Sequence, residues 1–158
     1  MPAKVKPIPD GYHTITPYLS IKGAANAIDF YKKAFGATEI MRMAEPDGRV
    51  GHAEVRVGDS RVMLADESPD IDFRSPHSIG GTAVHLHMYV EDADAVVRKA
   101  VAAGAKVVRP VQDQFYGDRS GSVADPYGHV WHVSTHKEDL SMEEIRKRAA
   151  AQHKGRKE

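Results

Sequence analysis

Two segments of the chain show the same succession of predicted elements: a strand, a helix and three further strands. The two helices also end alike, at Ala34-Phe35-Gly36-Ala37 in the first segment and at Ala102-Ala103-Gly104-Ala105 in the second. Glycine is favoured just after a helix because it adopts the left-handed conformation that ends one. A repeat of this length predicts duplicated modules that share a core, rather than a solenoid array.

Hydrophobic periodicity and turn residues locate the elements of each copy. The first copy is predicted to contain a strand at 14–21, a helix at 23–35, and strands at 38–44, 51–57 and 61–65. The second is predicted to contain a strand at 84–90, a helix capped by Asp92 that ends at Gly104, and strands at 106–111, around Gly121 and at 129–135. The polar segment 66–82 between them predicts a connection long enough to close over a site.

These elements predict a domain at 1–137, built from modules at about 13–66 and 83–137. Ser141 and Glu144 match a capping box, in which each side chain satisfies a backbone N–H group of the first helical turn. The segment 138–158 is therefore predicted to be a C-terminal helix that runs into a basic tail. Because the chain has no net formal charge, we expect that tail to be solvated rather than bound to nucleic acid.

The composition excludes several classes of protein. There is no cysteine, which rules out disulfides, thiolate nucleophiles and cysteine zinc sites. The formal charge of zero argues against a nucleic-acid-binding surface. No long apolar run occurs near the N-terminus, so we expect neither a signal peptide nor a membrane span, and a cytoplasmic location.

Histidine recurs on one face of three predicted strands. Because strand side chains alternate between faces, each of these strands has one apolar face and one polar face. The polar faces carry His52, Glu54 and Arg56; His85, His87 and Tyr89; and His132, Ser134 and His136. Imidazole serves as a metal ligand or a general base near neutral pH, so the set predicts a shared pocket, although each histidine alone could be a hydrogen-bonded structural residue.

The chain resembles the glyoxalase/bleomycin-resistance/extradiol-dioxygenase superfamily, the vicinal oxygen chelate proteins. The resemblance rests on three stretches and covers about 13–137: Ala27-Ile28-Asp29-Phe30-Tyr31 through Phe35-Gly36-Ala37, Gly58-Asp59 before Val62-Met63-Leu64, and Gly117-Asp118-Arg119 through Asp125-Pro126-Tyr127-Gly128-His129-Val130-Trp131. It implies an α+β fold of tandem βαβββ modules whose mixed sheets curl into a cup. It also implies a homodimer that binds a small molecule in the cup.

The resemblance leaves the activity open, since members include isomerases, thiol transferases, dioxygenases and proteins that sequester antibiotics. Carried over from glyoxalase-like enzymes, the metal-ligand positions are Thr16, Met63, His85 and His132. Two of these are good ligands, whereas Thr16 and Met63 replace the expected histidine or carboxylate.

One hypothesis is therefore an enzyme with a divalent metal, such as nickel, zinc, iron or manganese. His85, His132 and either His52 or Glu54 would hold the metal, which would polarise the oxygens of a substrate. Glu54 is the candidate catalytic base because it is the carboxylate on the polar faces.

The alternative hypothesis is a metal-free protein that binds or sequesters a small molecule. His87, Tyr89 and Tyr116 would line its cavity, and Arg119 would meet an anionic group. An ion pair with Asp118 or another neighbour is an equally good role for Arg119.

Overall fold

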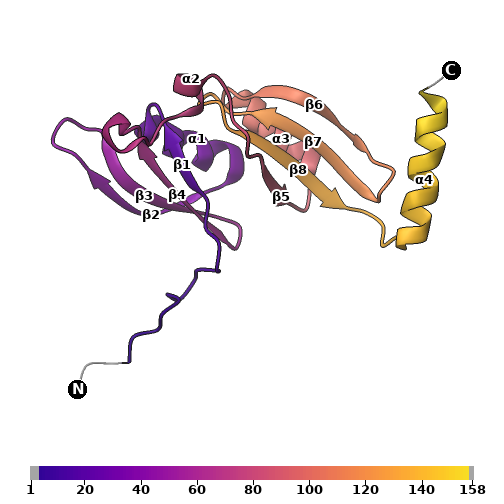
Figure 1. The fold of residues 1–158 in the computed structure, drawn as a ribbon, viewed down its shortest axis with the longest axis horizontal. Coiled ribbons are helices and arrows are strands. Elements are labelled where there is room, and N and C mark those ends of the chain that lie inside the picture. The colour runs from indigo at the N-terminus through magenta and orange to yellow at the C-terminus, as the bar shows by residue number, and fades with distance from the viewer. Residues whose placement is uncertain (1–3, 157–158) are drawn as a thin grey trace. The chain divides into compact units, whose positions relative to one another are not determined.

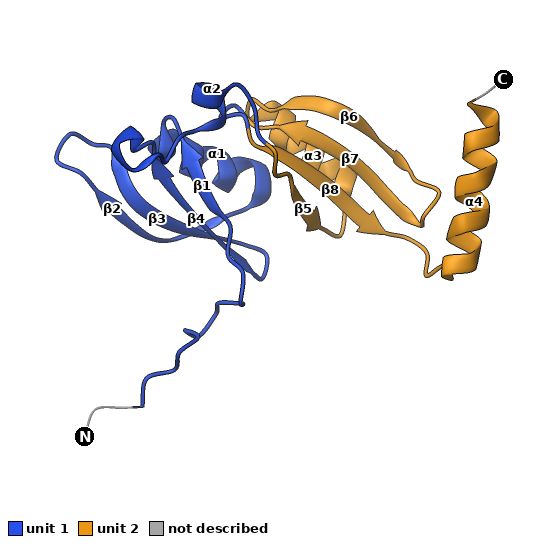
Figure 2. Cartoon of the chain, viewed as in Figure 1, with its two compact units in different colours: residues 1–82, 126–128 blue, residues 83–125, 129–158 orange. Residues whose placement is uncertain are grey.

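The computed structural model describes residues 4–156, which form two compact units (Figure 2). Unit 1 comprises residues up to Thr82 together with Pro126–Gly128, and unit 2 comprises Ala83–Asp125 and the chain from His129 onward. Each unit contains one four-stranded sheet. The predicted α+β class and the tandem βαβββ modules are confirmed.

Unit 1 contains the first βαβββ module (Figure 1). Its elements are β1 (Tyr18–Ile21), α1 (Ala24–Phe35), β2 (Thr38–Ala44), β3 (Val50–Val57) and β4 (Ser60–Asp66). The sheet order is β1-β4-β3-β2, in which β1 and β4 are parallel and the other pairs are antiparallel. The connection that follows contains η1 (Pro69–Ile71) and the one-turn helix α2 (Pro76–Ile79).

Unit 2 repeats this topology and adds a helix. Its elements are β5 (Leu86–Tyr89), α3 (Ala93–Ala102), β6 (Lys106–Asp113), β7 (Asp118–Ala124), β8 (Val130–His136) and α4 (Met142–Gly155). The sheet order is β5-β8-β7-β6, with β5 and β8 parallel. The Ser141 side chain accepts a hydrogen bond from the Glu144 backbone N–H at the start of α4, as a capping residue does.

One face of each sheet is covered by the helix of its module, and the core lies there. Ala27, Ile28 and Tyr31 of α1 are buried, as are Val55 and Leu64 of the sheet beneath. In unit 2 the corresponding layer contains Val97 and Ala100 of α3 with Val123, Trp131 and Val133. Because side chains alternate along a strand, this packing leaves the opposite face of each sheet for polar residues.

Some boundaries differ from the sequence prediction. The first strand begins at Tyr18 rather than at residue 14, because Pro17 has no N–H group and only its carbonyl joins the ladder, accepting from Met63 N. The strand around Gly121 is longer than predicted and begins at Asp118. Gly128 has φ of 90°, and a Cβ there would lie 2.7 Å from Pro76 Cβ, so the turn requires glycine.

Candidate functional site

The register of each sheet aligns four residues in a row on its polar face. In unit 1, Tyr18 of β1 pairs with Met63, Met63 pairs with Glu54, and Glu54 pairs with Met41 of β2. We call Tyr18, Met63, Glu54 and Met41 the first row. Residues in direct register point to the same side of a sheet and contact one another. The row therefore places one carboxylate between two thioethers and a phenol nearby.

The equivalent row of unit 2 has different chemistry. His87 of β5 pairs with His132, His132 pairs with Ser122, and Ser122 pairs with Arg109 of β6. We call His87, His132, Ser122 and Arg109 the second row. The two rows correspond position by position, because β1-β4-β3-β2 and β5-β8-β7-β6 have the same order and direction.

The first row is extended by His52 into a hydrogen-bonded relay. Tyr18 Oη lies 2.5 Å from His52 Nδ1, and His52 Nε2 lies 3.0 Å from Glu54 Oε2. An ionised carboxylate only accepts hydrogen bonds, so Nε2 carries the imidazole proton and donates it to Glu54. Nδ1 is then the acceptor for the Tyr18 hydroxyl. The three side chains have the geometry of a phenol, an imidazole and a carboxylate in series.

Burial within the relay increases from Tyr18 to Glu54. Tyr18 is 46% exposed, whereas Glu54 is 9% exposed and its Oε1 has no hydrogen-bond partner. Desolvation raises the pKa of the Tyr18 phenol, which keeps the hydroxyl protonated at neutral pH. The phenol thus loses its proton only if a neighbouring group accepts it, and His52 Nδ1 is in position to do so.

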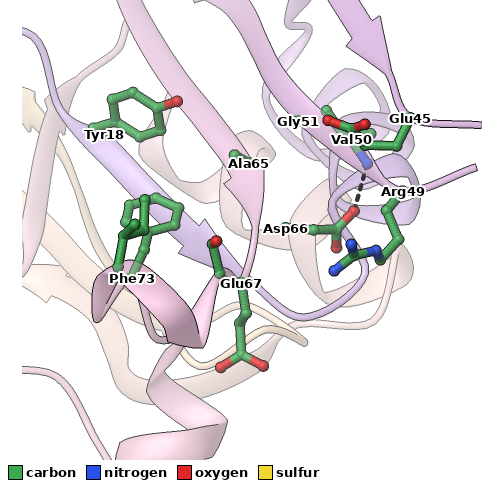
Figure 3. Close-up of a pocket in the computed structure, with 11 residues that line it drawn as sticks. Tyr18, Glu45, Arg49, Val50, Gly51, Ala65, Asp66, Glu67 and Phe73 are labelled. Carbon is green, nitrogen blue, oxygen red and sulfur yellow. Dashed lines mark hydrogen bonds between the residues drawn. The ribbon is translucent and has the colours of Figure 1, made fainter.

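A pocket of about 560 Å³ lies beside the exposed end of this relay in unit 1. Tyr18 and Phe73, whose rings meet edge to face at 5.2 Å, contribute to its wall together with Ile71 and Val50. Figure 3 shows the aromatic rings and the charged side chains of Glu45 and Arg49 among the lining residues. The volume lies within the range of pockets that bind small organic molecules.

Two carboxylates of this pocket have structural roles. Asp66 accepts hydrogen bonds from the backbone N–H groups of Gly23 and Ala24 at the start of α1, and from Val50 N at 2.7 Å (Figure 3). The Ser78 side chain and then the Ser75 backbone N–H donate to Glu67 and lower its pKa to about 2. Both groups hold the loop around the pocket, which leaves Tyr18 as the polar group of the wall that is connected to a proton acceptor.

The second row forms part of a cluster of histidines in unit 2. His85 Nδ1 lies 2.9 Å from His132 Nε2, and the His87 ring stacks on Tyr89. Burial lowers the pKa of His132, and the neighbouring His85, His87 and Arg109 lower it further by repelling positive charge. His132 is therefore neutral at pH 7.

A small cavity of about 110 Å³ opens on the second row. It is lined by residues of four strands and of the β6–β7 loop: His87, Arg109, Gln114, Tyr116, Ser120, Gly121, Ser122 and His132. Gly121 is required by the close approach of β6, since a Cβ there would lie 2.9 Å from the Val111 backbone. The Ser122 side chain is 1% exposed, and its Oγ has no hydrogen-bond partner.

Two residues predicted to bind ligand are engaged elsewhere in unit 2. Tyr89 donates a hydrogen bond to Asp118, which also pairs with His136 at 2.8 Å. Arg119 alternates with Ser120 along β7 and forms a two-point ion pair with Asp94 of α3, and a further one with Asp113. The Arg119 guanidinium thus lies on the helix-covered side of the sheet, away from the second row.

A family model matches residues 13–133, and its description is Glyoxalase/Bleomycin resistance protein/Dioxygenase superfamily. The chain belongs to this superfamily. An uncharacterized protein of Mycobacterium tuberculosis is 42% identical over 144 residues, which are 89% of this chain and 85% of that protein. An uncharacterized protein of Arabidopsis thaliana is 33% identical over 113 residues, 67% of this chain and 68% of the relative.

Solved structures share the superfamily fold. TioX from Micromonospora sp. ML1 matches with a TM-score of 0.61 and 25% identity, over 82% of this chain and all of TioX. FosX, a fosfomycin resistance protein of Listeria monocytogenes, was solved with Mn(II) and 1S,2S-dihydroxypropylphosphonic acid. It matches with a TM-score of 0.59 and 18% identity, over 85% of this chain and 94% of FosX, which is a likeness of fold.

The divalent metal that membership of the superfamily implies requires a set of converging donors. Within residues 4–156, no group of three His, Asp or Glu side chains is arranged to hold a metal ion. His85 and His132 supply two imidazoles that are hydrogen-bonded to each other, and the residue opposite His132 is Ser122 rather than a carboxylate. The donors of either unit by themselves therefore do not fit a chelated metal.

The predicted site residues thus divide between the units. His52 and Glu54 meet in unit 1, and His85, His87, His132 and Tyr116 gather in unit 2. The sequence analysis missed Tyr18, Ser122 and Arg109. Tyr18 could have been found from strand parity, since it lies in the first strand two residues from the proposed ligand position Thr16. No helix of residues 4–156 is long and apolar enough to cross a membrane.

Proposed function

We propose that the chain binds a small oxygenated molecule in the pocket of unit 1 and transfers a proton to and from it through Tyr18. The observation that carries this proposal is the hydrogen-bonded series Tyr18–His52–Glu54, whose exposed end lines the pocket. A buried carboxylate that orients an imidazole, which in turn accepts from a hydroxyl, is the arrangement by which proteins activate a hydroxyl group.

The proton transfer balances without an added reagent. A substrate C–H bond next to a carbonyl gives its proton to Tyr18 Oη, while the Tyr18 hydroxyl proton passes to His52 Nδ1. The product is an enolate beside an imidazolium, and the Glu54 carboxylate stabilises that imidazolium from Nε2. Return of the proton at a different position of the enolate gives an isomer. Tyr18 is the residue that touches the substrate, and His52 and Glu54 act through it.

The test is exchange of substrate hydrogen with solvent. Purified protein is incubated in D₂O with a panel of small 2-oxo acids and α-hydroxyketones, and loss of the C–H signal is followed by proton NMR. We expect catalysed exchange with at least one compound, and a reduction on the order of 10²- to 10⁴-fold in both Tyr18→Phe and Glu54→Gln.

Glu45→Gln is the matched control, because Glu45 lines the same pocket but lies outside the relay. It should retain exchange close to that of the parent protein. Absence of exchange across the whole panel, or unchanged exchange in Glu54→Gln, would refute the proposed chemistry.

A metal-free binding protein is the second candidate, and the apolar part of the pocket wall favours it. Phe73, Ile71 and Val50 supply surface for an organic ligand that needs no chemistry. A compound that raises the melting temperature of both the parent and Glu54→Gln, and that shows no solvent exchange in either, would support sequestration over catalysis.

The metal-dependent hypothesis remains a proposal for His85 and His132, whose nitrogens lie 2.9 Å apart. Elemental analysis of tag-free protein after incubation with nickel, zinc, iron or manganese tests it, with His85→Ala, His132→Ala as the comparison. About one metal per chain, lost in the double variant, is the supporting result, and no metal in the parent is the opposing one.

We also propose a homodimer. The edge strands β2 and β6 carry exposed apolar side chains, including Met43 on β2 and Val107 and Val108 on β6. Exposed apolar edges are commonly covered by a partner. Light scattering coupled to gel filtration distinguishes a dimer from a monomer.

A further inference from the structure

We propose that the cavity on the second row binds the oxyanion group of a small molecule, a phosphoryl group or a carboxylate, through Arg109 and Ser122. The site lies wholly in unit 2. It is therefore independent of the relay in unit 1, and either could exist without the other.

The buried hydroxyl of Ser122 is the first reason. Its Oγ is enclosed by protein, lines the cavity, and has no hydrogen-bond partner. An unsatisfied buried hydroxyl is costly, so proteins retain one mainly where a ligand or a water completes it. The adjacent serine of the same face behaves differently, because Ser120 Oγ accepts a hydrogen bond from Ser134 Oγ at 2.8 Å.

The unneutralised charge of Arg109 is the second reason. Its guanidinium forms no ion pair with any carboxylate in residues 4–156, whereas Arg119 of the neighbouring strand has two such partners. Asp118, a carboxylate on the same face of β7, is already engaged by Tyr89 and His136. An arginine lining a cavity without a counter-ion favours an anionic occupant, and its planar fork matches two oxygens of one anion.

The geometry of the sheet brings these groups together. Arg109 and Ser122 are cross-strand partners, and the register shifts in β6 on both sides of Arg109 set it opposite Ser122. The other lining side chains are polar and include Tyr116, His87 and His132. Neutral imidazole and phenol can each donate one hydrogen bond, which adds donors around the same space.

The size of the cavity limits what enters it. A volume of about 110 Å³ is smaller than a pocket for a whole drug-sized ligand. It suits a single small group, either a free oxyanion or the charged end of a longer molecule.

The test titrates inorganic phosphate and, separately, acetate into the full-length protein, with sodium chloride used to hold the ionic strength constant. The His132 and His87 imidazole proton resonances report the cavity by NMR. We expect saturable shifts with at least one anion, and a dissociation constant about tenfold weaker or more in Arg109→Gln, because a charge-assisted hydrogen bond is lost.

Arg98→Gln is the control, since Arg98 lies on α3 and not at the cavity. Its affinity should equal that of the parent. Binding of phosphate alone identifies phosphoryl compounds as the ligand class, binding of acetate alone identifies carboxylates, and binding of both identifies oxyanions in general. No saturable shift with either anion, or equal affinity in the parent and Arg109→Gln, overturns the proposal.

Discussion

Replacement of Ser122 by alanine should stabilise the protein and weaken its binding of oxyanions. This combination is unusual, because most substitutions of buried residues destabilise. It follows from the position of Ser122 Oγ, which is buried at the cavity without a hydrogen-bond partner. The hydroxyl therefore contributes a cost to the ligand-free protein that a bound anion would offset.

The expected size of the effect can be worked from the site. A buried unsatisfied polar group costs about 1–3 kcal/mol. Removing the oxygen enlarges a cavity that already exists, which costs roughly 0.3 kcal/mol for about 10 Å³. The free energy of unfolding in chloride should thus rise by about 1 kcal/mol, which corresponds to an increase in Tm of about 2–4 °C for a chain of this size.

The assay is urea unfolding in chloride and in phosphate at equal ionic strength, with Ser120→Ala as the matched control. Both serines lie on the same face of β7, but Ser120 Oγ accepts a hydrogen bond from Ser134. Ser120→Ala should therefore lower stability by about 1 kcal/mol. Phosphate should stabilise the parent and Ser120→Ala by linkage, and should stabilise Ser122→Ala less.

The opposite signs of the two serine variants make the reasoning easy to refute. If Ser122→Ala destabilises in chloride to the same extent as Ser120→Ala, the Ser122 hydroxyl is satisfied in solution. If phosphate stabilises the parent and Ser122→Ala equally, the hydroxyl takes no part in anion binding. Either result would remove the first of the two reasons for the oxyanion site.

Further predictions concern the hairpin and the pH dependence of unit 2. Asp125 accepts hydrogen bonds from Trp131 Nε1 and from the turn backbone, so Asp125→Ala should lower the free energy of unfolding by about 2–4 kcal/mol in urea, monitored by tryptophan fluorescence. Hydrogen bonds to Asp118 and Asp139 raise the pKa of His136, whereas burial lowers that of His132, so NMR titration from pH 8 downward should show His136 protonating first. The stabilisation from His136 is full below its unfolded pKa of about 6.5 and is lost as pH rises through the folded value. His136→Gln should remove that loss.

The two faces of the strands were predictable because side-chain alternation has no exceptions within a regular strand. Trp131 and Val133 are 4% and 0% exposed on the helix-covered face, and His132 lies on the other, as parity requires. The same rule separates Arg119 from Ser120, so the helix-facing position of Arg119 was also implicit in the sequence. Residue type, rather than position, suggested Arg119 as a ligand-binding group.

The relay and the second row depend on information that is absent from local sequence. Tyr18 reaches His52 across 34 positions only because β4 lies between β1 and β3. Arg109 lies opposite Ser122 because β6 is irregular on both sides of it, and such register shifts leave no clear mark in the sequence. The expected set of His85, His132 and His52 was chosen by strand face, and strand face does not reveal which strands belong to one sheet.

The formal charge of the chain is zero, but this balance hides a difference between its two copies. At matching positions of the two rows, Glu54 lies between Met41 and Met63, whereas Ser122 lies between Arg109 and His132. The first row holds an anion without a cation, and the second holds a cation without an anion. A charged metabolite would thus discriminate between the modules by the sign of its charge, so duplication has given one polypeptide two electrostatic filters built on the same backbone.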